Sequence, residues 1–124
     1  MERAKEICPT TSLGKIKEGA VLVDVRELKE INDIAFGVAN QLIIPLSEFE
    51  ERFQEIPKDK EVVVACSTGS RSLKAVYYLM NHGYESVFNM RDGIVKWARK
   101  GFPVQGDATH LLNDSSCCSN EGCC

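Results

Sequence analysis

Runs of β-branched and aliphatic residues, bounded by turn residues, mark the strands of this chain. The two clearest runs are Val21–Val25 and Glu61–Cys66, and neither shows a strict alternation of apolar and polar positions. Strands of this kind are buried on both faces, as in a parallel sheet. The segments Gln41–Pro45 and Ser86–Met90 have a similar composition and are expected to form further strands.

Helical periodicity fills the intervals between the later strands. Apolar residues at three- and four-residue spacing predict one helix over residues 70–82 and a shorter one that ends at Gly101. Ser47 and Glu50 have the spacing of a capping box and predict the start of another helix. The alternation of strands and helices predicts an α/β fold with a mainly parallel central sheet flanked by helices.

Composition narrows the possible partners. The chain has 124 residues, 44% hydrophobic and 27% charged, and a net charge of -3. The length and composition predict one domain, over residues 1–106, and the net charge argues against nucleic-acid or membrane partners. The periodicity disappears after Pro103, so we expect residues 107–124 to form a flexible Cys-rich tail. The first residues lack the apolar run of a secretory signal, so we expect a cytoplasmic protein.

The segment after the strand at 61–66 carries the candidate chemistry. Cys66 follows that strand, and small polar residues then lead into a helix. Backbone N–H groups and the helix dipole in such a turn form a cradle for negative charge, and a cysteine there has a depressed pKa. The alternative is a buried structural cysteine. The residues expected in the cradle are Ser67, Thr68, Gly69, Ser70 and Arg71.

The chain resembles the rhodanese family. Its loop Cys66-Ser67-Thr68-Gly69-Ser70-Arg71 matches that family's Cys-x-x-Gly-x-Arg motif. Further matches, in the family's order over residues 7–106, are Leu22–Glu27, Ile44–Leu46, Asp92–Trp97 and Gly101–Val104. The segment Phe36–Pro45 departs from the pattern, because the histidine common there is missing and a glycine is shifted.

The resemblance implies a three-layer domain and a specific reaction. The Cys66 thiolate would take sulfur from a donor such as thiosulfate or a protein persulfide, and a thiol, a protein thiol or cyanide would then accept it. This covalent cycle needs neither a metal nor an organic cofactor. Arg71 would either contact the anion or fix the loop by pairing with a carboxylate. We expect a monomer.

Three other functions fit parts of the sequence. Phosphatases and arsenate reductases also use a cysteine and an arginine around an oxyanion, although with five residues between the two. A sulfur carrier without turnover on small molecules would need the same activated cysteine. The tail contains two pairs of adjacent cysteines, Cys117 with Cys118 and Cys123 with Cys124. These pairs would bind a soft metal or metalloid, take part in a thiol relay, or form no site.

Overall fold

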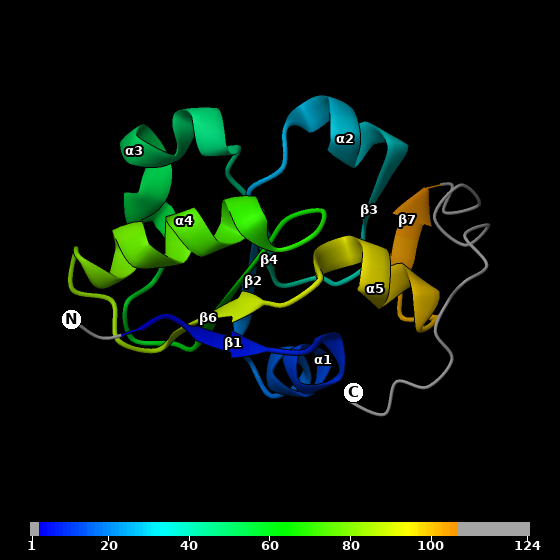
Figure 1. Cartoon of the computed structure of the whole chain (residues 1–124), viewed down its shortest axis with the longest axis horizontal. Coiled ribbons are helices and arrows are strands. Elements are labelled where there is room, and N and C mark those ends of the chain that lie inside the picture. Colours follow the sequence, from blue (N-terminus) through cyan, green and yellow to red (C-terminus); the bar gives the residue numbers. More distant parts are fainter. Residues whose placement is uncertain (1–2, 107–124) are drawn as a thin grey trace.

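A parallel sheet forms the centre of the molecule (Figure 1). The computed structural model describes residues 3–106, and the predictions for the Cys-rich tail lie outside the described residues. The strands of the sheet are β1 (Lys5–Ile7), β2 (Val21–Asp24), β4 (Gln41–Ile43), β5 (Val62–Ala65) and β6 (Val87–Met90). Their order is β1-β6-β5-β2-β4, and every neighbouring pair is parallel.

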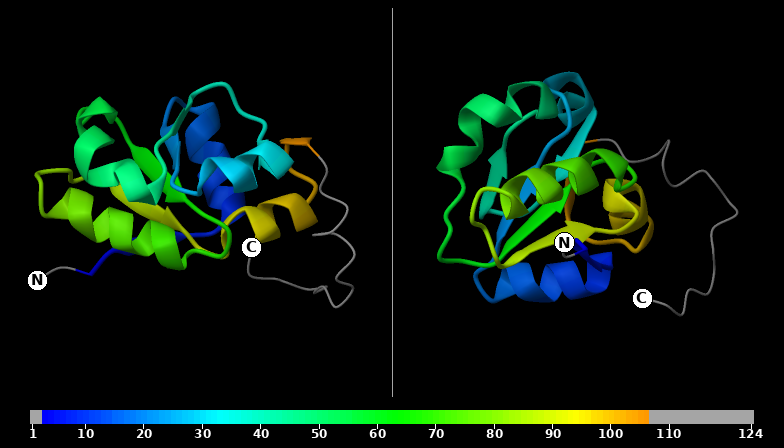
Figure 2. Two further views of the ribbon diagram at one scale, coloured as in Figure 1. Left: turned by 90° about the horizontal axis from the view of Figure 1, so that it is seen from above. Right: turned by 60° about the vertical axis from the view of Figure 1, so that its left-hand side comes forward.

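Helices cover both faces of this sheet (Figure 2). On one face lie α3 (Phe49–Arg52) and α4 (Ser70–Met80), and on the other lie α1 (Pro9–Lys17) and α5 (Gly93–Arg99). Each face has its own hydrophobic cluster beneath its helices. The α/β fold with a mainly parallel sheet flanked by helices is therefore confirmed. Among residues 3–106, no helix is long and apolar enough to cross a membrane.

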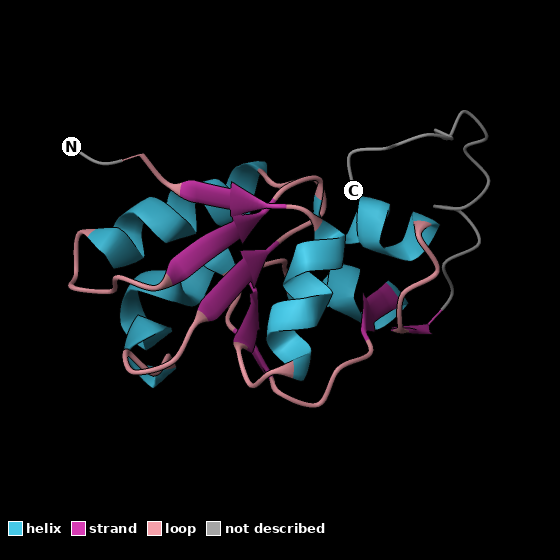
Figure 3. Cartoon of the chain, turned by 90° about the horizontal axis from the view of Figure 1, so that it is seen from below, coloured by secondary structure: helices cyan, strands magenta, loops and turns pink. Residues whose placement is uncertain are grey.

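The central strand, β5, positions the candidate site. Val62 and Val64 pack into the cluster beneath α3 and α4, whereas Val63 and Ala65 pack into the cluster beneath α1 and α5. All four residues are fully buried, which explains the continuous apolar run. In Figure 3 the strands of this sheet all point towards one edge. Cys66 lies at that edge, where open α/β sheets commonly bind ligands.

A second, smaller sheet adjoins α5. It pairs β3 (Ile34–Phe36) with β7 (Val104–Gly106) in antiparallel fashion, and α2 (Leu28–Asp33) precedes β3. The segment that departs from the family pattern begins in β3. It is fixed by the Gln41 side chain, whose Nε2 donates to the carbonyls of Phe36, at 2.8 Å, and Val38, at 2.9 Å. A glutamine amide thus organises this loop.

The predicted capping box at Ser47 is wrong. Ser47 lies inside a 3₁₀ turn (Leu46–Glu48) that precedes α3, and its hydroxyl donates to Glu27 at 3.0 Å. The observed capping box lies elsewhere, between Glu27 and Glu30 at the start of α2. A carboxylate from another part of the chain competes for the Ser47 hydroxyl, which sequence spacing alone does not reveal.

A buried ion pair lies at the carboxyl end of β2. Asp24 is fully buried and Arg26 is 1% exposed. The guanidinium donates to the carboxylate through Nη2 at 2.8 Å and Nε at 3.0 Å, and the Arg26 backbone N–H adds a bond at 3.1 Å. Asp24 therefore organises the chain after β2, as expected for a buried carboxylate with hydrogen-bond partners.

Removing the Arg26 charge should destabilise the fold strongly. In Arg26→Met the Asp24 carboxylate stays buried without its cation, so the free energy of unfolding should fall by about 3 to 5 kcal/mol, measured by urea denaturation. Lys15→Met is the control, because Lys15 pairs with Glu61 at a partly exposed site, at 3.3 Å. Equal losses in the two variants would contradict the importance of the buried pair.

Candidate active site

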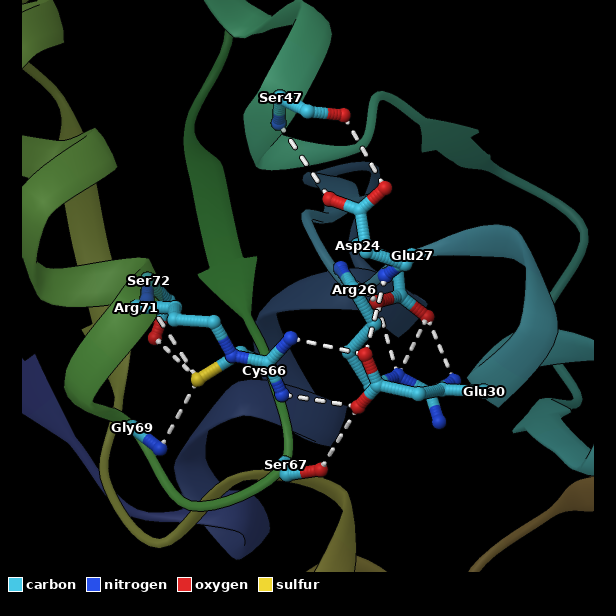
Figure 4. Close-up of polar contacts among 10 residues, drawn as sticks. All are labelled: Asp24, Arg26, Glu27, Glu30, Ser47, Cys66, Ser67, Gly69, Arg71 and Ser72. Carbon is cyan, nitrogen blue, oxygen red and sulfur yellow. Dashed lines mark hydrogen bonds and ion pairs between the residues drawn. The ribbon is translucent and has the colours of Figure 1, made fainter.

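Cys66 lies at the turn between β5 and α4, and its sulfur is enclosed by hydrogen-bond donors (Figure 4). The residue is free of any disulfide and has no exposed surface. Its Sγ accepts from the backbone N–H of Gly69 at 3.1 Å and of Ser72 at 3.4 Å. The Ser72 hydroxyl lies 3.4 Å from the same sulfur. The turn therefore aims donors from the start of α4 at one buried atom.

These donors favour the thiolate. Burial raises the pKa of the Cys66 thiol, because it removes water from the charged form. Hydrogen bonds from Ser72 and from the backbone N–H groups of Gly69 and Thr68 lower that pKa and outweigh burial, so the pKa lies below its ordinary value. The surroundings of Cys66 thus favour its ionised form.

The turn depends on a glycine at position 69. Gly69 has φ of +105°, in the left-handed region that residues with a side chain rarely adopt. A Cβ there would also lie 3.2 Å from the Asp92 nitrogen and 3.4 Å from the Met90 carbonyl oxygen. Gly69 can therefore present its N–H to Sγ and still pack against the end of β6.

The start of α5 holds the other side of the loop. The backbone N–H of Ile94 donates to the Cys66 carbonyl at 2.9 Å, and that of Val95 donates to the Ser67 carbonyl at 3.2 Å. Gly93 permits this approach, because a Cβ on it would lie 2.3 Å from the Cys66 oxygen. The free N–H groups of α5 are thus used to fix the backbone that carries the cysteine.

Arg71 pairs with a carboxylate on α2. Its Nη1 and Nη2 atoms donate to the two oxygens of Glu30, each at 2.8 Å. The hydrogen bond from Arg71 holds the pKa of Glu30 at about 2, below its ordinary 4.5, although burial opposes the shift. Glu30 in turn raises the pKa of Arg71. Of the two roles considered for Arg71, this geometry favours fixing the loop.

The remaining residues expected in the cradle have different surroundings. Ser67 donates from its hydroxyl to Glu30 at 3.4 Å, whereas Thr68 and Ser70 are exposed. Sequence reasoning missed three residues that shape the site, namely Glu30, Ser72 and Asn89. The Ser72 hydroxyl forms a hydrogen bond with Asn89 Oδ1, and both residues are fully buried. Of these three residues, only Glu30 could have been found from the sequence, because it lies three residues after Glu27, the spacing of a capping box.

Two pockets open beside the loop. One of about 260 Å³ is lined by Thr68, Asp92, Val95, Lys96 and Arg99. The other, of about 150 Å³, reaches Ser67 and Glu30. Both are small, so they fit a ligand of a few atoms or the tip of a side chain better than a large cofactor. In residues 3–106 no His, Cys, Asp and Glu side chains group together to hold a metal ion.

Substituting Gly93 should damage both the fold and the loop. The added methyl group of Gly93→Ala must displace the Cys66 carbonyl, so the free energy of unfolding should fall by about 1 to 3 kcal/mol. Iodoacetamide should also alkylate Cys66 more slowly, because its backbone donors are displaced. Gly14→Ala is the control, since a Cβ there meets nothing within 4 Å. If Gly93→Ala matched this control in urea unfolding and in alkylation rate, the approach of α5 to the Cys66 carbonyl would not require a glycine at position 93.

The Glu30–Arg71 pair should make the free energy of unfolding depend on pH in the acid range. Between pH 4.5 and about 2 the folded chain keeps Glu30 ionised while the unfolded chain takes up a proton, so unfolding becomes easier as the pH falls through this range. Urea unfolding across that window should show a shallower loss in Glu30→Gln than in the wild type. Glu61→Gln, which alters a more exposed carboxylate, should retain the wild-type slope.

Comparisons with known proteins agree with this geometry. The model of the rhodanese-like domain family matches residues 10–100. A sulfurtransferase of Allochromatium vinosum is 44% identical over 88 residues, covering 70% of this chain and 79% of that protein. A thiosulfate sulfurtransferase of Haemophilus influenzae is 30% identical over 104 residues, covering 81% and 93%. A crystal structure of a rhodanese-related protein from Thermoplasma volcanium has a TM-score of 0.74 at 31% identity, covering 83% of this chain and 99% of that one. The chain therefore belongs to the rhodanese-like domain family.

Proposed function

We propose that this chain is a sulfurtransferase that carries sulfur on Cys66 as a persulfide. The observation that carries the proposal is the buried Cys66 sulfur, which accepts hydrogen bonds from the backbone N–H groups of Gly69 and Ser72. Relatives named sulfurtransferase and thiosulfate sulfurtransferase, at 44% and 30% identity, support the same activity.

In the first step the Cys66 thiolate attacks the outer sulfur of an anionic donor such as thiosulfate. The new Sγ–S bond forms as the donor's S–S bond breaks, and sulfite leaves with the electron pair of that bond. The negative charge passes to the terminal sulfur of the persulfide. This is nucleophilic catalysis with a covalent intermediate, and no outside oxidant or reductant is required.

In the second step a nucleophilic acceptor, either a thiolate or cyanide, attacks the terminal sulfur. The Sγ–S bond breaks and its electron pair returns to Cys66, which regenerates the thiolate. Donors fixed before the reaction stabilise this charge without reorganisation, and the N–H groups of Gly69 and Ser72 already lie at Sγ. Thr68 and Ser70, in the same loop, are exposed to solvent.

In this proposal Arg71 fixes the position of the loop. Both of its terminal nitrogens are engaged by Glu30, which joins the start of α4 to α2. Substrate anions are then held mainly by the loop, formed by Ser67, Thr68, Gly69 and Ser70.

Phosphate and arsenate chemistry fits the site less well. Only four residues separate Cys66 from Arg71, whereas the phosphatase and arsenate-reductase loops use five. An arginine that chelates a tetrahedral oxyanion must direct its guanidinium into the loop, and here that group faces Glu30. The loop also contains no acidic residue to protonate a leaving group.

The test is intact-mass spectrometry of the reduced protein after thiosulfate and then after cyanide. The wild type should gain about 32 Da, the mass of one sulfur on the nucleophile, and lose it to cyanide. Cys66→Ser should gain nothing. Truncation after Ser116, which removes the four tail cysteines, should leave the gain unchanged.

Other outcomes would separate the rival functions. A gain that follows only the tail cysteines would refute Cys66 as the sulfur-bearing residue. No gain from thiosulfate, together with a gain from a protein persulfide, would reject the thiosulfate donor and support a carrier. Turnover of an aryl phosphate that needs Cys66 would favour the phosphatase alternative.

A further inference from the structure

A chain of hydrogen bonds leads away from Cys66 through the buried Ser72 and Asn89 to Glu6, an exposed residue of β1. The Ser72 hydroxyl lies 3.4 Å from Cys66 Sγ and also bonds to Asn89 Oδ1. Asn89 Nδ2 donates to Glu6 Oε2 at 2.8 Å and to the Gly69 carbonyl at 3.1 Å. Strand register brings Glu6 and Asn89 together, because they are paired residues of β1 and β6.

The orientation of the Asn89 amide follows from its partners. A carboxylate and a backbone carbonyl only accept hydrogen bonds, so the atom that faces them must be the NH₂ group. Both amide protons are then used on Glu6 and the Gly69 carbonyl. The oxygen is left facing Ser72, and an amide oxygen can only accept. The Ser72 hydroxyl must therefore donate to Asn89 for that contact to be favourable.

Ser72 has one hydroxyl proton and two neighbours that accept it. When Cys66 is a thiol, its S–H donates to the Ser72 oxygen, the Ser72 hydroxyl donates to Asn89, and every group is satisfied. When Cys66 is a thiolate, the same proton is needed at Sγ, because an unpaired hydroxyl oxygen facing a thiolate is repulsive. Asn89 and the thiolate compete for one proton.

We propose that Asn89 is a positioning residue that holds the Ser72 hydroxyl proton while Cys66 is a thiol and yields it to Sγ when the sulfur becomes negative. The hydroxyl rotates and no proton passes along the chain. Once sulfur is transferred, the charge moves to the terminal sulfur, and the Ser72 hydroxyl returns to Asn89. This last step rests on the proposed function, whereas the competition itself does not.

Several charged groups also face this region. Arg71 on α4 lies near Cys66, Glu30 lies beyond it on α2, Glu6 lies behind Asn89 on β1, and Asp92 precedes α5 beside Gly69. Of these, the Arg71 guanidinium interacts with Cys66 through its charge. A double-mutant cycle keeps all four groups in every variant, so their contributions cancel.

The experiment measures the pH dependence of iodoacetamide alkylation of Cys66 in the full-length chain. Trypsin releases Cys66 in a peptide of residues 61–71, where it is the only cysteine, so the other five do not interfere. The variants are Ser72→Ala, Asn89→Leu and the double variant. Asn89→Leu is made both in the chain that keeps Ser72 and in the Ser72→Ala background, and the shift in the Cys66 pKa is compared. The shift in the chain that keeps Ser72 should lie below the shift in the Ser72→Ala background by about one pKa unit, the scale of one charge-assisted hydrogen bond.

The sign of this difference separates competition from simple loosening. Loss of the Asn89 bond to Gly69 loosens the loop equally in both backgrounds, and only release of the Ser72 proton requires Ser72. A difference of zero, or of the opposite sign, overturns the proposal. Ser12→Ala is the matched control, because Ser12 is also fully buried but donates to the Cys8 carbonyl, at 2.9 Å. It should leave the Cys66 pKa unchanged.

A second measurement needs no change at Asn89, should its variants fail to fold. The S–H stretch of Cys66, isolated by subtracting the infrared spectrum of Cys66→Ser, should lie at lower frequency in the wild type than in Ser72→Ala. Donation from the thiol to Ser72 causes that lowering. Equal frequencies would show that the thiol does not donate to Ser72, which also overturns the proposal. Neither experiment involves sulfur transfer, so failure of the proposed function is seen separately.

Discussion

A buried sulfur that can carry negative charge imposes the main constraint on this structure. Cys66 has no exposed surface, and a buried charge is costly unless hydrogen bonds replace the lost water. The replacement comes from the N–H groups of Gly69 and Ser72. Because these donors belong to the backbone, the direction of their N–H bonds depends on the conformation of the main chain and not on a side-chain rotamer. The loop must therefore be held rigidly by the elements around it.

Three elements hold that loop, and each makes polar contacts with it. From α5, Ile94 and Val95 donate to the carbonyls of Cys66 and Ser67; from β6, Asn89 donates to that of Gly69. From α2, Glu30 receives both terminal nitrogens of Arg71. The first two elements also contribute to the hydrophobic clusters, but α2 has no buried residue. Ionic and hydrogen-bonded contacts thus hold α2 in place, and segments of this kind open at lower free energy than the packed sheet.

The sequence predicted those features that depend on local pattern. The strand runs, the helix at α4 and the cysteine at the carboxyl end of β5 follow from burial on both faces and from helical periodicity. The short elements β1, α1, α2, β3 and β7 were missed, because segments of three to nine residues leave little periodicity. Ser72 and Asn89 were missed for another reason. They meet only when β6 pairs beside β5 and α4 packs over both, so no spacing along the chain connects them.

The fixed and rotatable donors suit different stages of the proposed cycle. The N–H groups of Gly69 and Ser72 point at Sγ whatever its charge, so they stabilise the thiolate at the start and at the end. They have less to stabilise in the persulfide, when the charge lies one bond further out. The Ser72 hydroxyl can turn, and Asn89 gives it a second acceptor at that stage. A site with only fixed donors would favour the thiolate throughout and thereby oppose sulfur loading. A donor that can leave Sγ removes part of that penalty, which is why a buried asparagine beside the loop matters to the chemistry.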